Sequence, residues 1–148
     1  MVKFIGEYIA KIDNQGRVVF PSPFKNIVAE EGDLRFVLKR DLFFNCLEMY
    51  TYQEWIRLSE EVKAKLNFFN REHSLFWREY MRDRALVEPD PKLGRIAIPK
   101  RLLEEIGAVK EIRFVGSDHK IEVWATRQFD QERLSSVQYL ELAKKLLG

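Results

Sequence analysis

The chain has few of the residues that stabilise small folds through disulfide bonds or bound metal ions: its 148 residues include one cysteine and two histidines. A lone Cys46 excludes an internal disulfide and a cysteine-based zinc cluster, because both need several thiols. No stretch approaches the roughly 18–20 apolar residues of a membrane-spanning helix. The first residues also lack the apolar run and small-residue cleavage site of a signal peptide. We therefore expect a soluble cytosolic protein with no metal, cofactor or membrane partner.

The charge balance gives no global argument for a nucleic-acid partner, because the formal net charge is only +2. Charge does gather locally. Residues 92–101 carry four basic residues and no acidic one, and residues 11–25 carry a net charge of +2. Such patches are compatible with steering a polyanion and equally with an ordinary solvated surface. The hydrophobic content of 46% is high enough to build a core, so a disordered chain is excluded.

The sequence repeats itself. Gly16-Arg17-Val18-Val19-Phe20-Pro21 and Gly94-Arg95-Ile96-Ala97-Ile98-Pro99 share the pattern Gly-Arg, three apolar residues, Pro, at a shift of 78 residues. The same shift aligns Leu34-Arg35-Phe36-Val37 with Ile112-Arg113-Phe114-Val115. A shift of 74 then aligns Leu47 to Tyr50 with Ile121 to Trp124. Several blocks in the same order indicate an internal duplication.

Each copy predicts two strands, a short helix and two further strands. Alternating apolar residues at Tyr8, Ala10 and Ile12 predict the first strand, and residues 85–88 are its weaker equivalent. Ser22-Pro23 predicts a helix N-cap followed by proline at the first helical position. A unit of about 45 residues buries little core by itself. We therefore expect the two copies to interleave their strands in one pseudo-two-fold-symmetric α+β domain.

Apolar residues between and after the copies recur at helical spacing. Trp55, Leu58, Val62 and Leu66 predict a helical connector, which Asn67 to Asn70 interrupts, with Asn70 capping a second helix. Leu134, Val137 and Leu140 predict a terminal helix. We expect these helices to cover the repeats or a neighbouring subunit.

The turn Asp13-Asn14-Gln15-Gly16-Arg17 is the most informative local element. Gly16 supplies the positive φ of a tight turn, and the Asp13 carboxylate is placed to hold the Arg17 guanidinium by charge-assisted hydrogen bonds. An oriented arginine binds phosphate or the edge of guanine. An ordinary turn with a surface ion pair is the alternative for a single copy. The second turn repeats Gly-Arg, and two such turns on one face would match the two-fold symmetry of duplex DNA.

Enzyme signatures do not occur in the sequence. It has no His-Glu-x-x-His, no Gly-x-Ser-x-Gly, no phosphate-binding glycine-rich loop and no Cys/His cluster. Cys46 is expected to be a small buried hydrophobe. We therefore do not expect an enzyme or a small-molecule substrate.

With Asp-x-x-x-Arg and the duplicated Gly-Arg, apolar, apolar, apolar, Pro pattern, the chain resembles the MraZ transcriptional regulators of the AbrB-like DNA-binding superfamily. The resemblance covers nearly the whole chain. It implies an internally duplicated AbrB-like swapped-hairpin β-barrel with a helical connector and a C-terminal helix. The boundaries expected on this basis are repeat 1 at 7–54, the connector at 55–82, repeat 2 at 83–126 and the C-terminal helix at 127–148.

The resemblance further implies a cytoplasmic, nucleoid-associated regulator that binds double-stranded DNA. Family members form ring-shaped homo-oligomers on repeated boxes ahead of division and cell-wall genes. The family's Asp-x-x-x-Arg motif falls on Asp13 and Arg17, and in the second copy Arg95 matches. Pro91 occupies the second aspartate position and Asp90 lies one residue too early, which leaves open whether Asp90 reaches Arg95. Weaker candidates for phosphate contacts are Lys11, Lys92, Lys100 and Arg101.

A protein-interaction module of the same fold, such as an antitoxin-like partner of another protein, is the alternative function. Antitoxin-type relatives pair one swapped-hairpin unit with a disordered acidic tail. The tail of this chain is amphipathic and carries Arg133, Lys144 and Lys145. The sequence therefore favours the DNA-binding function.

Overall fold

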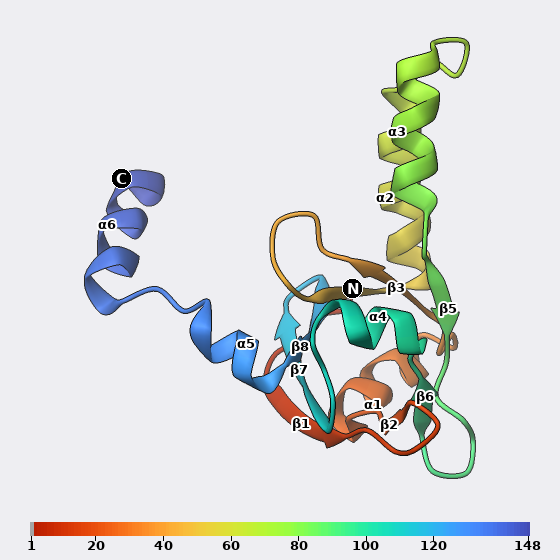
Figure 1. Cartoon of the computed structure of the whole chain (residues 1–148), viewed down its shortest axis with the longest axis vertical. Coiled ribbons are helices and arrows are strands. Elements are labelled where there is room, and N and C mark those ends of the chain that lie inside the picture. The colour runs from red at the N-terminus through yellow and green to blue at the C-terminus, as the bar shows by residue number, and fades with distance from the viewer. Residues whose placement is uncertain (1) are drawn as a thin grey trace.

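Strands from the two halves of the sequence interleave within one mixed α+β structure. The computed structural model describes residues 2–148. The first half forms β1 (Glu7–Lys11), β2 (Arg17–Val19), α1 (Ser22–Glu30), β3 (Phe36–Arg40) and β4 (Leu47–Thr51). The second half forms β5 (Ala85–Val87), β6 (Arg95–Ala97), α4 (Lys100–Glu105), β7 (Glu111–Ser117) and β8 (Lys120–Ala125). Helices α2 (Tyr52–Ala64) and α3 (Arg71–Met81) join the halves, and α5 (Thr126–Gln131) and α6 (Ser136–Leu147) end the chain (Figure 1).

Each half supplies an edge strand to the other. The large antiparallel sheet has the order β1-β7-β8-β4-β3-β5, so β1 pairs with β7 of the second half and β5 pairs with β3 of the first. The central pair β4–β8 places Glu48 opposite Glu122. Strands β2 and β6 form a separate two-stranded antiparallel ribbon. The expected α+β class is confirmed.

The core lies between one face of the large sheet, the ribbon and helices α1 and α4. Phe20, which follows the ribbon strand β2, has its ring centroid 5.1 Å from that of Phe36 and 5.6 Å from that of Phe114. All three side chains are buried. Because these rings come from both halves, neither half has a complete core without the other.

Helix α1 begins differently from the prediction. The N-cap position is Pro21, which offers no side-chain hydrogen bond, and Ser22 is the first helical residue. The Ser22 N-cap was therefore wrong by one residue. Phe24 and Val28 face the core as expected. In the second half α4 likewise starts after a proline, Pro99, and buries Leu102 and Leu103.

The connector is a helical hairpin that projects from one end of the sheet (Figure 1). The Asn70 side chain accepts hydrogen bonds from the backbone N–H groups of Glu72 and His73, so the predicted cap is confirmed. Near the sheet, the Trp55 and Tyr80 rings stack with centroids 5.6 Å apart. The tail, for which the sequence predicts one helix, holds two, and the residues between α5 and α6 include Leu134.

A buried ion network covers the outer face of the central strands. The Lys39 Nζ lies 2.8 Å from a Glu48 carboxylate oxygen, and the Lys120 Nζ lies 2.5 Å from the other. Lys120 also lies 3.8 Å from Glu122. Two glutamates opposite one another would repel, and the lysines neutralise them. Burial would raise the pKa of Glu48, but hydrogen bonds from Lys120 and Lys39 outweigh it and hold that pKa below its ordinary value of 4.5.

Candidate nucleic-acid interface

The β2–β6 ribbon presents two arginines on one face. Its register pairs Arg17 with Ala97, Val18 with Ile96 and Val19 with Arg95. Residues directly opposite on antiparallel strands share a face, and successive residues alternate. Val18 and Ile96 are buried in the core. Arg17 and Arg95 therefore both project from the outer face, as diagonal neighbours about 7–8 Å apart at their Cα atoms.

The first arginine is held by a carboxylate in the turn before β2. The Asp13 Oδ2 accepts a hydrogen bond from the Arg17 Nε at 2.9 Å, and Oδ1 accepts from the backbone N–H groups of Gln15 and Arg17. The pKa of Asp13 is lowered, chiefly by the backbone N–H of Arg17. Gly16 has a φ of +77° and its carbonyl accepts from the Ile98 N–H of the other half. The turn is therefore fixed at both ends.

The second arginine is held in the same way despite Pro91. The Asp90 Oδ2 accepts a hydrogen bond from the Arg95 Nε at 3.1 Å and another from the Arg95 backbone N–H at 2.9 Å. Hydrogen bonds to Asp90, chiefly from the Leu93 backbone N–H, lower its pKa far below the ordinary value. The extra residue lengthens the turn without removing the carboxylate. Asp90 thus replaces the motif aspartate.

Both arginines are available to a ligand. Their side chains are partly exposed, 34% for Arg17 and 25% for Arg95. Within residues 2–148 the hydrogen bonds of both guanidinium groups are made by Nε. The Nη1 and Nη2 groups, which form the fork that binds phosphate or a guanine edge, therefore remain free.

Two lysines lie beside the turns of the opposite half. Lys25 of α1 places its Nζ over Gly94, 3.5 Å from where a β-carbon on that residue would be. Lys100 of α4 lines a surface hollow together with Asp13 and Gly16. Sequence reasoning named Lys100 but not Lys25. The sequence indicates Lys25 only as one of the basic residues in 11–25, because its proximity to the second turn arises from the interleaving of the halves.

The remaining candidates are dispersed. Lys92 is exposed in the second turn, and Lys11 is exposed at the end of β1 in the large sheet rather than on the ribbon. Arg101 forms ion pairs with Asp83 at 3.0 Å and Glu105 at 3.7 Å. Its charge is thus already compensated, which makes it the weakest of the candidates for a phosphate contact.

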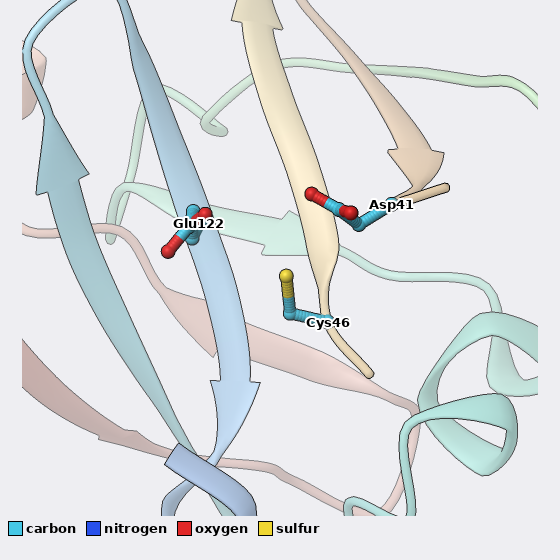
Figure 2. A group of neighbouring side chains, drawn as sticks. All are labelled: Asp41, Cys46 and Glu122. Carbon is cyan, nitrogen blue, oxygen red and sulfur yellow. The ribbon is translucent and has the colours of Figure 1, made fainter. Parts of the chain in front are cut away.

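A second group of polar side chains lies on the outer face of the large sheet, beside the ion network. Asp41, Cys46 and Glu122 bring their ligand atoms within 4.8 Å of one another (Figure 2). Burial raises the pKa of the Cys46 thiol far above its ordinary value, so the thiol is protonated. The ammonium of Lys120 lies 3.9 Å from Asp41 and 3.8 Å from Glu122. The ammonium of Lys120 therefore already offsets part of the negative charge of these carboxylates.

A known protein family matches most of the chain. The family described as "MraZ protein, putative antitoxin-like" matches residues 4–79 and 83–143. The chain belongs to the MraZ family. None of the helices within residues 2–148 has the length and apolar character of a membrane span.

Curated MraZ relatives match over nearly their full length. A protein named Transcriptional regulator MraZ from Bacteroides thetaiotaomicron is 34% identical, over 94% of this chain and 88% of its own. Another protein of that name, from Christiangramia forsetii, is 34% identical, over 100% of this chain and 95% of its own. A third, from Clostridium tetani, is 31% identical, over 97% of this chain and 96% of its own. The relatives of this MraZ chain are thus named as regulators of transcription, which is not an enzyme class.

Proposed function

We propose that the chain is a sequence-specific DNA-binding transcriptional regulator of the division and cell-wall gene cluster. It acts in the cytoplasm, associated with the nucleoid. The observation that carries the proposal is the pair of arginines on the outer face of the β2–β6 ribbon, each fixed through Nε by an aspartate. The names of the relatives support the assignment to transcription.

The geometry of the ribbon suits the major groove. A two-stranded β-ribbon fits that groove, which is about 12 Å wide. Bidentate contact of arginine with guanine O6 and N7 discriminates bases, whereas a lysine beside the groove contacts phosphate. Arg17 and Arg95 are suited to the first role, and Lys25, Lys92 and Lys100 to the second. Asp13 and Asp90 are positioning residues that orient the arginines.

We assign the fold to the AbrB-like swapped-hairpin class, duplicated within one chain. The registers support an approximate two-fold axis, because Val18 is opposite its repeat equivalent Ile96 and Glu48 is opposite its equivalent Glu122. The exchange of β1 and β5 between the halves is the corresponding hairpin swap. The division into 7–54, 55–82, 83–126 and 127–148 follows these repeats.

We propose that the protein binds repeated DNA boxes as a ring-shaped homo-oligomer. Apolar side chains are exposed on two separate parts of the molecule: Phe68, Phe69 and Phe76 on the α2–α3 hairpin, and Val137, Leu140 and Leu146 on α6. Two different patches on one chain favour a head-to-tail contact, which closes into a ring when the rotation permits. A ring on consecutive boxes gains affinity through effective concentration.

Footprinting tests the proposal. The DNA upstream of the division and cell-wall gene cluster is digested by a nuclease in the presence of the wild-type protein or of the double variant Arg17→Ala/Arg95→Ala. Lys65→Ala, at the exposed end of α2, is the control. Wild type and Lys65→Ala should protect the same repeated boxes, and the double variant should protect none. Absence of protection by the wild type, or unchanged protection by the double variant, would overturn the proposal.

The second candidate is an antitoxin-like protein-interaction module. The description of the family, which includes the words "antitoxin-like", supports this alternative. Such a module would leave the DNA unprotected and would bind a partner protein instead. The well-capped helix α6, with Lys144 and Lys145 in its last turn, differs from the disordered acidic tail expected of that class. The footprint separates the two functions.

A further inference from the structure

The two turns share a scaffold but differ at their tips. The Asp13 Oδ1 accepts a hydrogen bond from the Gln15 backbone N–H at 2.8 Å, and the Asp90 Oδ1 accepts one from the Leu93 backbone N–H at 2.8 Å. Gln15 and Leu93 each precede the glycine of their turn. They therefore occupy equivalent positions, and Asn14 is the equivalent of Lys92 one residue earlier.

The side chains at these positions are chemically different. Asn14 and Gln15 are exposed, and the group that Asp13 holds is the backbone of Gln15 and not its amide. Each amide offers a donor and an acceptor, the pattern that binds the N6 and N7 edge of adenine. Lys92 is exposed and offers a flexible point charge. Leu93 is 62% exposed and offers no hydrogen bond.

The turns flank the same short ribbon. The Gly16 carbonyl accepts from the N–H of Ile98 and the Gly94 carbonyl accepts from the N–H of Phe20, so one turn lies at each end of β2–β6. The strands are only three residues long, which is about 10 Å at 3.3 Å per residue. One duplex therefore meets both turns within a few base pairs.

We infer that the two turns have divided the work of recognition: Asn14 and Gln15 read base edges, whereas Lys92 anchors the phosphate backbone. The inference rests on the proposed function. The paired arginines contribute to both ends of the site, and the sequence preference added by the turn tips comes from the first turn. Leu93, at the second tip, has no polar side-chain atom with which to read a base edge.

The test measures affinity for two labelled duplexes, the footprinted box and a scrambled box of the same composition, over a range of salt concentrations. Asn14→Ala/Gln15→Ala should lower the ratio of the two affinities about tenfold and leave the salt dependence unchanged. Lys92→Ala should weaken binding to both duplexes equally and reduce the slope of log K against log salt by about 1. Lys92→Arg is the matched control, and it should retain the wild-type slope.

Contrary outcomes are distinct. An unchanged affinity ratio in Asn14→Ala/Gln15→Ala, or a changed ratio in Lys92→Ala, overturns the division of roles. A Leu93→Gln variant extends the test, since an amide placed at the second tip should alter base preference at that end of the box. Failure of the wild type to bind either duplex overturns the proposed function itself.

Discussion

Asp90 accepts a hydrogen bond from the Nε of Arg95, which lies five residues after it in the sequence. Asp13 accepts the equivalent bond from the Nε of Arg17, which lies four residues after it. The longer second turn accommodates Pro91 and still returns the carboxylate to the arginine. Equal bracing of both arginines gives the ribbon two fixed guanidinium groups. A loosely held arginine would lose side-chain entropy on binding, and the aspartates reduce that cost.

The two carboxyl groups should titrate at low pH. Hydrogen bonds to the ionised forms lower both pKa values from the ordinary 3.8, and that of Asp90 furthest. A lowered pKa means that the contribution of each brace is present above 3.8 and is lost only as pH falls through the native value. NMR titration of the side-chain carboxyl carbons measures both values. Titration of Asp90 at a higher pH than Asp13 would contradict these hydrogen bonds.

Gly16→Ala should destabilise the first turn. The position has a φ of +77°, and a β-carbon there would lie 3.2 Å from the Ile98 carbonyl oxygen. Left-handed backbone alone costs about 1–2 kcal/mol for alanine, and the contact adds to it. Gly32→Ala is the control, because its φ is +79° with no atom within 4 Å. Chemical denaturation should show the larger loss for Gly16→Ala, and equal losses would show that the contact is unimportant.

Much of this fold follows from local pattern. The alternation at Tyr8 and Ala10, the Asn70 cap and the inward face of α1 are properties of short segments, and each is found in the structure. The Ser22 N-cap was wrong because the Pro21 carbonyl already accepts the first helical hydrogen bond, from the Lys25 N–H, so the helix begins one residue earlier. The tail helix is divided at residues 132–135 because Ser135 and Gln138 form a new capping box, a signal that apolar spacing alone does not reveal.

The site was predicted less completely because part of it depends on contacts distant in sequence. The arginines and Asp13 stand out through the repeated motif. Lys25 lies beside Gly94 only because α1 of one half packs near the turn of the other. The Asp90 brace required the actual path of a five-residue turn. Residue spacing does not determine either relationship.

Lys120→Met should destabilise the fold by about 3 kcal/mol at neutral pH, since it leaves the buried Glu48 and the half-buried Glu122 undercompensated. The pKa of Glu48 is lowered from 4.5, so the stabilising ion pair is present above that pH and is lost as pH falls. The difference between variant and wild type should therefore shrink in acid. Urea unfolding across pH measures it. The exposed Lys63→Met should cost less than about 0.5 kcal/mol, and a difference that grows in acid would contradict the network.

Val137→Ser/Leu140→Ser should disrupt the oligomer and leave the monomer folded. Both side chains are exposed on α6, 65% and 57%, so their replacement removes apolar area from the proposed subunit contact and none from the core. Native mass spectrometry should show smaller assemblies, with an unchanged near-ultraviolet circular dichroism spectrum. Lys145→Ser on the same helix is the control. A wild-type mass distribution in the double variant would exclude α6 from the subunit contact.

The most direct test of the account is the affinity of Arg17→Lys and Arg95→Lys for the footprinted duplex at fixed ionic strength, with native mass confirming the assembly. Lysine keeps the charge but has neither the Nε that the aspartate holds nor the planar fork. The account predicts that each lysine variant loses about tenfold or more in affinity, close to the loss in the alanine variants. Lysine variants that bind as tightly as the wild type would show that charge alone suffices, and would contradict the role of the braced arginine pair.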